Sequence, residues 1–185
     1  LGRISHNQGR FNIDSAYDGN GSLVEEIYTR LGQPLRRVAY TWDSQNRLSE
    51  IHYQDQSRPA FLPSVPDNAI TFAYDDVGNR IKKSVNGVPR YYLNNGLSVL
   101  HELSAAGGIG KTMIDGLAEL DAQGNLTYIH QDALGSTALV TNAAGAVLSE
   151  YDYDPWGEFS GLLEQDGAST NYLFTGQEFD PESEL

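Results

Sequence analysis

The chain has 185 residues, including 19 Gly and 11 Tyr but no Cys, and its formal net charge is −13. The negative charge disfavours partners that need basic patches, namely nucleic acid and anionic membrane surfaces. The lack of Cys excludes disulfides and thiolate metal sites, and no apolar run approaches the roughly 18 residues that a membrane-spanning helix needs.

A short motif recurs along the chain. It consists of an aromatic residue, an Asp, a turn containing Gly or Asn, a polar residue and then a large apolar residue. One copy has Leu in the aromatic position, and another, degenerate copy lacks the Asp. In chain order the copies are Tyr17–Leu23, Tyr28–Leu35 (degenerate), Trp42–Leu48, Tyr74–Ile81, Leu120–Leu126 and Tyr153–Phe159.

Each copy is typical of a β-turn between two strands. An Asp side chain can accept a hydrogen bond from the backbone two residues on, and Gly or Asn tolerates positive φ. The aromatic ring is expected to end one strand on the buried side, and the following apolar residue to begin the next. The turn residues predicted in this way are Asp18, Asp43, Asp75, Gly78, Asp121, Gly124, Asp132, Gly135, Gly145, Asp154 and Gly157, and the predicted packing residues are Tyr17, Trp42, Tyr74, Tyr153 and Trp156.

The pattern is densest between Tyr128 and Glu158, where three turn signals separate segments of period-two alternation. Helical periodicity is nearly absent, and the best helix candidate is a turn near Ser98–Leu103. The sequence therefore predicts an all-β fold of successive antiparallel β-hairpins. Because one hairpin cannot bury its own face, these hairpins need neighbours on both sides, and we expect the chain to be a segment of a longer protein.

One segment imitates a phosphate-binding P-loop. Ala105–Thr112 ends in Gly-Lys-Thr, but Ala105 stands where a P-loop has Gly, and Asp115-Gly116 follows where a helix is required. A Gly-rich hairpin turn is the preferred interpretation.

Other candidate sites are weaker. The four His residues show no metal-binding spacing. Neighbouring carboxylates at Asp75-Asp76, at Asp152 with Asp154, and at Glu25-Glu26 could support an acidic hydrolase if they converged in a cleft. They fit turn caps and a solvated acidic face better. We therefore assign no catalytic, cofactor-binding or metal-binding residue to this chain.

Tyr74–Ile81 and its relatives resemble the YD repeat of the RHS (rearrangement hot spot) proteins. Tyr128–Gly157, followed by Tyr172–Pro181, looks like the RHS-repeat-associated core. The resemblance divides the chain into a YD-repeat shell segment, residues 1–127, and a truncated associated core, residues 128–185. The matching core-motif residues are Tyr153, Pro155, Trp156, Gly176, Asp180 and Pro181.

The resemblance implies that the hairpins form part of a long sheet that spirals into a hollow shell. In bacterial members the shell encloses a C-terminal toxin, which an aspartate autoprotease in the core releases. The protease aspartates of the family are expected beyond Leu185, and Glu184 stands where the family usually has Gly. The resemblance therefore implies a structural role without enzymatic activity in this segment.

The implied partners are the rest of the shell, an enclosed C-terminal toxin, and other toxin-complex or secretion-system components. The implied location is outside a bacterial cell or at its surface, without membrane insertion by this segment, nucleic acid or cofactor. Relatives include the C components of Tc toxin complexes, polymorphic toxins and the animal teneurins. A teneurin-like or wall-associated adhesion module that recognises a glycan or a receptor is the alternative function.

Overall fold

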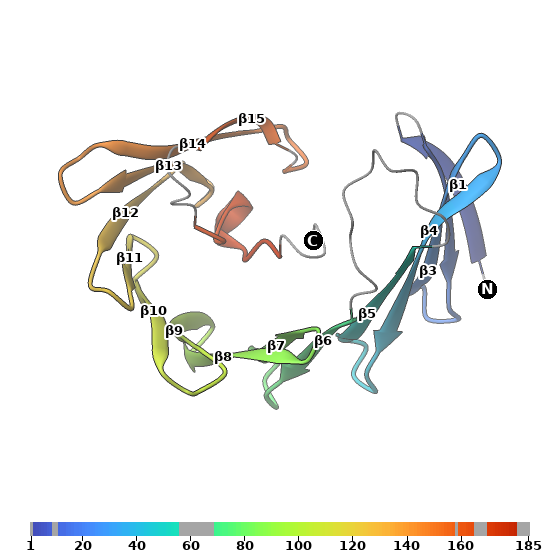
Figure 1. Ribbon diagram of the computed structural model, residues 1–185, viewed down its shortest axis with the longest axis horizontal. Helices are drawn as coiled ribbons and strands as arrows, with labels where there is room; N and C mark the ends of the chain where they lie inside the picture. The colour runs from blue at the N-terminus through green and yellow to red at the C-terminus, as the bar shows by residue number, and fades with distance from the viewer. Residues whose placement is uncertain (1, 9–10, 56–68, 158, 165–169, 181–185) are drawn as a thin grey trace. The chain divides into compact units, whose positions relative to one another are not determined.

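The computed structural model describes residues 2–8, 11–55, 69–157, 159–164 and 170–180. These residues form fifteen β-strands and one short 3-10 helix, η1 (Phe174–Gly176), so the all-β prediction is confirmed (Figure 1). The chain divides into two compact units, Leu1–Pro89 and Arg90–Leu185. The predicted boundary between residues 127 and 128 is a different division, and it stays a prediction.

Within each unit the strands pair with their sequence neighbours, and these pairings are antiparallel. This order is the simplest one that short turns allow. The strands are β1 (Gly2–Gln8), β2 (Phe11–Tyr17), β3 (Leu23–Arg30), β4 (Gln33–Trp42), β5 (Leu48–Asp55), β6 (Ala69–Tyr74), β7 (Arg80–Val85), β8 (Val88–Asn95), β9 (Ser98–Leu103), β10 (Ile109–Ile114), β11 (Ala118–Asp121), β12 (Leu126–Gln131), β13 (Thr137–Asn142), β14 (Val147–Tyr153) and β15 (Phe159–Glu164).

The helix candidate at Ser98–Leu103 is wrong, because this segment is strand β9. It pairs on one side with β8, where Leu93 faces His101, and on the other with β10, where His101 faces Thr112. Pairing on both sides outweighs any local preference of six residues for a helical turn. The Gly-rich segment after it is a hairpin turn, in which the Ser104 amide donates to the Gly108 carbonyl at 2.8 Å.

The core of the first unit lies on one face of β4–β6. Val38, Ile51, Tyr53 and Ile70 form a buried cluster. The register places Val38 opposite Tyr53 and Ile51 opposite Ile70, so the cluster crosses the strands from pair to pair. Side chains two residues apart point to the same face, which explains how alternate positions of short strands build one continuous core.

A carboxylate lies on the same face of the first unit. Glu26 accepts hydrogen bonds from the hydroxyls of Tyr40 (2.9 Å), Tyr28 (3.2 Å) and Ser15 (3.3 Å). Burial raises the pKa of Tyr28 and of Tyr40 above the usual range, and the nearby Glu26 charge raises both further. Both phenols therefore remain protonated and keep donating to Glu26, which satisfies a charge that would be costly to bury alone.

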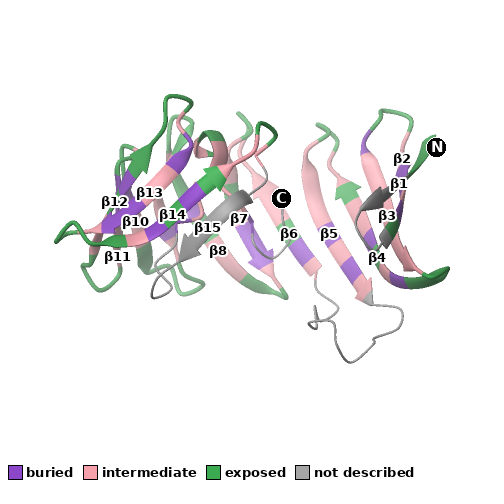
Figure 2. Ribbon diagram, turned by 90° about the horizontal axis from the view of Figure 1, so that it is seen from above, coloured by how far each residue is buried: buried purple, intermediate pink, exposed green. Residues whose placement is uncertain are grey.

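The second unit buries a smaller apolar cluster of Val140, Tyr151 and Leu173, against which Leu148 and Phe179 also pack. Val140 and Tyr151 come from β13 and β14, whereas Leu173 comes from the segment that follows β15. Figure 2 shows buried residues along the middle of β12–β14 and exposed residues at the turns that join the strands. The apolar core of this unit is therefore completed by a segment outside the sheet.

Replacing Ile51 by Ala tests the core of the first unit. Ile51 is fully buried, and removing its methyl groups should lower the free energy of unfolding by about 2–5 kcal/mol through lost burial and a residual cavity. Urea unfolding measures the change. Ile4→Ala on β1, where the side chain is 56 % exposed, is the control and should cost less than about 1 kcal/mol. Equal losses in the two variants would contradict this core.

Candidate functional site

The Asp-containing turns share one hydrogen-bond arrangement. In the turn between β4 and β5, Asp43 Oδ1 accepts from the amides of Gln45 and Arg47, both at 2.9 Å, while Asn46 takes positive φ. The carboxylate thus satisfies two amides that the strand pairing leaves without a partner. The same pair of bonds occurs at Asp18, Asp75, Asp121, Asp132 and Asn142, and the first of the two occurs at Asp154.

The structure places every predicted turn Gly in these turns with positive φ. The values lie between 80° and 96°, a region that residues with a Cβ rarely adopt. Gly145 belongs to the turn that Asn142 caps, so Asn can replace Asp in this role. These positions are Gly78, Gly124, Gly135, Gly145 and Gly157.

The aromatic residue before the Asp connects its turn to the turn before it on the same edge. Trp42 Nε1 donates to the Leu23 carbonyl at 2.7 Å, and the Tyr74 hydroxyl donates to the Leu48 carbonyl at 2.8 Å. In the second unit the Tyr153 hydroxyl donates to the Thr137 carbonyl at 2.9 Å. In all three cases the acceptor lies five residues after the Asp of the earlier turn.

Sequence reasoning assigned only packing to these aromatic residues and missed their hydrogen bonds. A signal was present, because the aromatic copies of the motif contain Tyr or Trp and never Phe. Tyr and Trp carry a donor at the end of the ring, and a buried ring end needs a partner for that donor.

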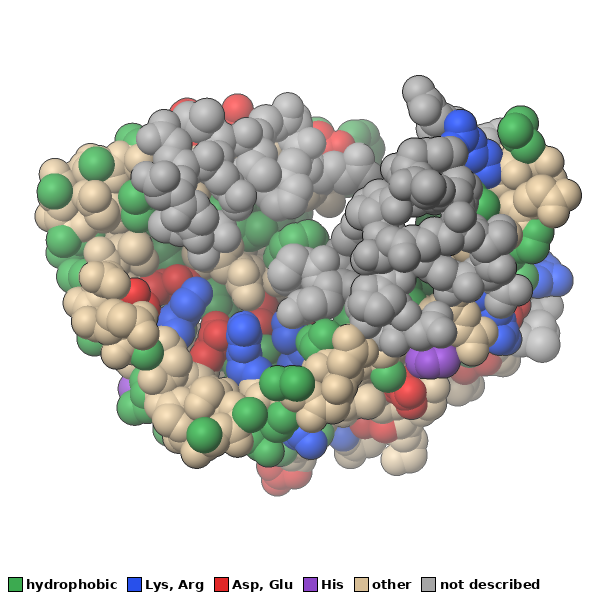
Figure 3. Space-filling view, in the orientation of Figure 1, with side chains coloured by type: hydrophobic (Ala, Val, Ile, Leu, Met, Phe, Trp, Pro, Cys, Tyr) green, Lys and Arg blue, Asp and Glu red, His purple; other side chains and the backbone are tan. Residues whose placement is uncertain are grey.

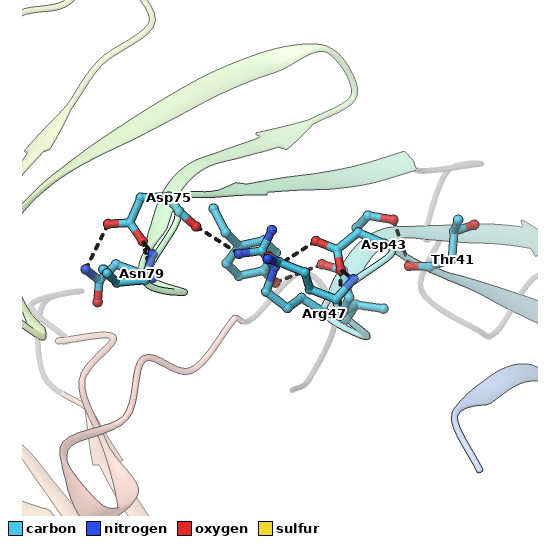
Figure 4. A network of polar contacts seen from close by, with 10 residues as sticks. Thr41, Asp43, Arg47, Asp75 and Asn79 are labelled. Atoms are coloured by element: carbon cyan, nitrogen blue, oxygen red, sulfur yellow. Dashed lines mark hydrogen bonds and ion pairs between the residues drawn. The ribbon is translucent and has the colours of Figure 1, made fainter. Parts of the chain in front are cut away.

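A second set of contacts connects successive turns along the same edge of the first unit. Ser22 Oγ donates to Asn46 Oδ1 at 2.8 Å. Arg47 is bound to Asp43 in its own turn, through Nε and Oδ2 at 2.7 Å, and its Nη1 reaches the Asp75 carbonyl of the next turn at 2.8 Å. Figure 4 shows Arg47 between these two turns. We call the turns 18–22, 43–47 and 75–79, with the bonds between them, the turn ladder.

The carboxylates of three turns, Asp43, Asp75 and Asp121, have lowered pKa values. The backbone amide of Arg47, together with its guanidinium, lowers the pKa of Asp43. The side-chain amide of Asn125, followed by its backbone amide, lowers the pKa of Asp121. Hydrogen bonds to the charged form favour that form, so these three turns are capped by ionised carboxylates at neutral pH.

Residues Thr170–Asp180, which we call the C-terminal strap, pack against the sheet of the second unit. Strands β9 to β15 curve around this segment (Figure 1). Leu173 is buried against Val140 and Tyr151, and the Phe174 ring lies 5.5 Å from the Tyr153 ring. The aromatic residue of the Asp154 turn therefore contacts both the preceding turn and the strap.

Hydrogen bonds to Ser136 and Thr137, at the start of β13, fix the position of the strap. The Thr137 amide donates to the Leu173 carbonyl at 3.1 Å, and Thr137 Oγ1 donates to the Tyr172 carbonyl at 2.6 Å. The Thr175 amide donates to Ser136 Oγ at 3.0 Å. Ser136 and Thr137 are both fully or almost fully buried by this contact.

Two buried glutamates bind the strap at its polar end. Glu119 pairs with Lys111 at 2.7 Å and accepts a hydrogen bond from Thr170 Oγ1. Glu102 pairs with Arg90 at 3.2 Å and accepts from the Tyr172 hydroxyl at 3.3 Å. Figure 3 shows acidic and basic side chains interleaved over β8–β11. Each buried carboxylate thus has a cation and a hydroxyl from the strap, which offsets the cost of its desolvation.

A cavity of about 360 Å³ opens between this cluster and the strap, lined by Arg90, Glu102, Lys111 and Asn171 among others. Both cations in it are already paired with carboxylates. The charged part of its lining is therefore already used in ion pairs.

Two glycines allow the strap to approach the turns. A Cβ on Gly157 would lie 2.7 Å from the Phe174 ring, and one on Gly176 would lie 3.4 Å from the Gly135 carbonyl oxygen. Asp180 is buried at the end of the strap. Pro155 lies in the exposed Asp154 turn, and Pro181 is outside the described residues.

The packing role predicted for Trp156 is wrong within the described chain, because its side chain is 83 % exposed. Trp156 occupies the second position after Asp154, where its amide donates to the Asp154 carboxylate at 2.8 Å. At this position the side chain points away from the turn, whereas the residue before the Asp reaches the neighbouring turn.

The other candidate sites do not assemble. Glu25 pairs with Arg37 at 2.6 Å, whereas Glu26 accepts from Tyr residues, because adjacent strand residues point to opposite faces. Asp75 caps its turn while Asp76 is exposed. The part of the chain that the structure describes contains no group of three or more potential metal ligands, and none of its helices has the length and apolarity to cross a membrane.

The pKa shift of Asp121 makes stability depend on pH. A carboxyl with a lowered folded pKa stabilises the fold above its unfolded pKa near 4, and this contribution is lost as the pH falls through the folded value. Asp121→Asn keeps the acceptor oxygen that Asn142 uses in its own turn but removes the charge. Urea unfolding between about pH 2.5 and 7 should show the wild type more stable above pH 5, with the difference shrinking towards acid. A difference that does not vary with pH would contradict this assignment.

Gly157→Ala should loosen the strap. Gly157 has a φ of 91°, and the added Cβ would overlap the Phe174 ring. Hydrogen exchange at the Leu173 and Phe179 amides should accelerate by about tenfold or more. Gly145→Ala carries the same kind of backbone strain at a φ of 80°, with no atom within 4 Å of its Cβ, and should leave strap exchange unchanged. Equal acceleration in both variants would assign the effect to backbone strain alone.

No family model matches the chain. Among curated proteins it is similar to the tRNA3(Ser)-specific nuclease WapA of Bacillus spizizenii, with 28 % identity over 177 residues, and to the tRNA nuclease WapA of Bacillus subtilis strain 168, with 27 % identity over 177 residues. Each match covers 92 % of this chain and 7 % of the relative.

Among solved structures, the chain is similar to the TcdB2–TccC3–Cdc42 crystal structure, with a TM-score of 0.57 and 13 % identity, and to the Tc holotoxin pore of Photorhabdus luminescens containing a TccC3 variant, with a TM-score of 0.52 and 12 % identity. Each match covers 94 % of this chain and 11 % of the other. At these identities the likeness concerns the fold alone. Because TccC3 is an RHS-containing toxin component, the chain has an RHS-like fold.

Proposed function

We propose that the chain is a structural wall segment of an RHS-type toxin, and that the sheet to which it contributes encloses a C-terminal toxin cargo. Its likeness to WapA and to TccC3 covers almost the whole chain but a small fraction of each relative. Segments of repeated structure that contact only their neighbours extend by repetition. Such a segment contributes to a wall rather than to a self-contained site.

The turn ladder carries this proposal. Each turn of the ladder donates to or accepts from the next, through Trp42 to Leu23, Tyr74 to Leu48, and Arg47 to Asp75. Strand pairing alone leaves hairpins free to twist about one another, whereas bonds at the turns also hold one edge in place. A wall that retains a cargo needs this second restraint, since an open seam would release the contents.

The charged face of the second unit also suits a wall. Glu102 is paired with Arg90 and Glu119 with Lys111, so the buried carboxylates do not present isolated charges. A surface whose charges are paired in this way attracts a charged polypeptide weakly. The face can therefore lie next to a cargo without binding it tightly.

The predicted turn and core-motif residues have structural roles in this proposal. The carboxylates cap turns, the glycines permit them, and Gly157 and Gly176 admit the strap. The division into residues 1–127 and 128–185 assigns the first part to the repeat wall and the second to the core that carries the strap. In this proposal the chain has a structural role, and the parent acts outside the bacterial cell or at its surface.

The intact mass of the full-length parent protein tests the proposal. Under denaturing conditions we expect two masses, that of the shell and that of a released C-terminal piece. In native size-exclusion chromatography the two should elute together, because the cargo is enclosed without a covalent bond. A cargo that separates natively would contradict enclosure.

A single uncleaved chain that digests like an open, extended protein would also overturn the proposal. It would favour the alternative of a surface binding module, which the exposed rings of Tyr91 and Tyr128 would suit. A glycan array with the same protein distinguishes the two, because enclosure predicts no retained glycan.

A further inference from the structure

The basic residues of the second unit gather at one cavity. The chain has 12 Lys and Arg residues, but between Arg90 and Leu185 these are only Arg90 itself and Lys111. Both line the cavity of about 360 Å³ beside the strap. This volume lies within the range of about 300–1,000 Å³ that is usual for small-molecule sites. In an otherwise acidic unit, the cavity is therefore where a ligand with a negatively charged group meets cations.

A β-bulge directs Lys111 into the cavity. Ile109 pairs with Leu103, but the next pair is Lys111 with Glu102, so Gly110 is an extra residue in β10. Without the bulge, Gly110 would lie opposite Glu102 and Lys111 would lie on the other face, because successive strand residues alternate. Gly110 itself lines the cavity and adds no side chain there. The Gly and Lys of the segment that imitates a P-loop thus serve the cavity, although that segment is a hairpin turn.

The ion pairs leave hydrogen-bonding groups available in the cavity. Arg90 has five N–H donors and Lys111 has three, and within the described part of the chain each contacts one carboxylate. Their side chains remain 44 % and 22 % exposed. Two further lining groups, the Ser104 hydroxyl and the Asn171 carboxamide, have no hydrogen-bond partner among the residues that the structure describes. Convergent polar groups of this kind orient a ligand.

The balance of charge selects the class of ligand. Arg90 and Lys111 are each balanced by a carboxylate, from Glu102 and Glu119, so the cluster has no surplus charge to hold a dianion. Glu102 lines the cavity beside Arg90 and is 5 % exposed. A carboxylate has about four acceptor positions, which leaves room for a further donor. A ligand with a carboxylate next to an ammonium group complements cations and a carboxylate placed side by side.

We propose that this cavity binds a small α-amino acid. The ligand carboxylate accepts hydrogen bonds from Arg90 and Lys111, and its ammonium group donates to Glu102. Ser104 and Asn171 supply further polar contacts. Because Asn171 belongs to the strap, the bound amino acid contacts both the sheet and the strap. The inference goes beyond the proposed function and does not depend on it, since a wall segment needs no small ligand.

A nuclear magnetic resonance titration of the ¹⁵N-labelled 185-residue chain tests this inference. The probes are L-alanine, L-leucine and L-glutamine, and the comparison ligands are acetate and methylamine, each of which carries one of the two charged groups. We expect at least one of the amino acids to bind with a Kd of about 1 mM or lower, at least about tenfold more tightly than either comparison ligand. The amide signals of Ser104, Gly110 and Lys111 should shift, and that of Gly145 should not.

Three outcomes of this titration would overturn the proposal. The first is that none of the three amino acids binds with a Kd below about 10 mM. The second is that acetate binds as tightly as the amino acids, which would assign the cavity to carboxylates in general. The third is that the shifted amides lie away from the residues that line the cavity.

A matched pair of variants locates the site. Asn171→Asp adds a negative charge to the lining at nearly constant shape and removes neither ion pair, so repulsion of the ligand carboxylate should weaken binding by about tenfold or more. Asn95→Asp makes the same change at an exposed position of β8 that does not line the cavity, and should bind as the wild type does. Equal binding by the two variants would contradict the site.

Ser104→Ala keeps the outcome clear if Asn171→Asp does not fold. It removes only an exposed hydroxyl, and losing one neutral hydrogen bond should weaken amino-acid binding roughly two- to tenfold. Unchanged binding would remove Ser104 from the site. Together with unshifted Gly110 and Lys111 amides in the wild type, it would overturn the proposal.

Discussion

The hydrogen bond from an aromatic side chain to the carbonyl that follows the preceding turn is the interaction on which this structure depends. Hairpins in a row are held together by strand pairing, but pairing does not set how the turns lie along an edge. Trp42, Tyr74 and Tyr153 each set that position by reaching one turn back. The rest of the turn, with its capping Asp and its Gly, keeps the donor and the acceptor in place.

The strap shows how the second unit combines apolar and charged contacts. Leu173 completes a core that β13 and β14 cannot close by themselves, while Glu102 and Glu119 accept hydrogen bonds from its hydroxyl groups. Burial raises the pKa of Tyr172 above the usual range, and the charge of Glu178 raises it further. The hydroxyl therefore remains a donor at neutral pH.

Much of the fold could be read from the sequence, because local chemistry determines it. An Asp followed by Gly or Asn at fixed spacing marks a turn, and the register follows from the turns. The strap could not be predicted, because Thr137 and Ser136 contact residues that lie about 35 to 39 positions away, and no local pattern indicates such a pairing. The packing role predicted for Trp156 is wrong because residue type does not show which way an aromatic ring near a turn points. The ring of Tyr153, before the Asp, reaches the neighbouring turn, whereas the ring of Trp156, two residues after it, is exposed.

The acceptors of these three aromatic donors are main-chain carbonyls, at Leu23, Leu48 and, in the second unit, Thr137. A substitution at any of these positions changes a side chain but leaves the carbonyl in place. The acceptor residue can therefore be replaced without loss of the hydrogen bond, provided that the donor ring is retained. Side-chain changes of this kind are compatible with a backbone arrangement shared with solved structures at only 12–13 % identity.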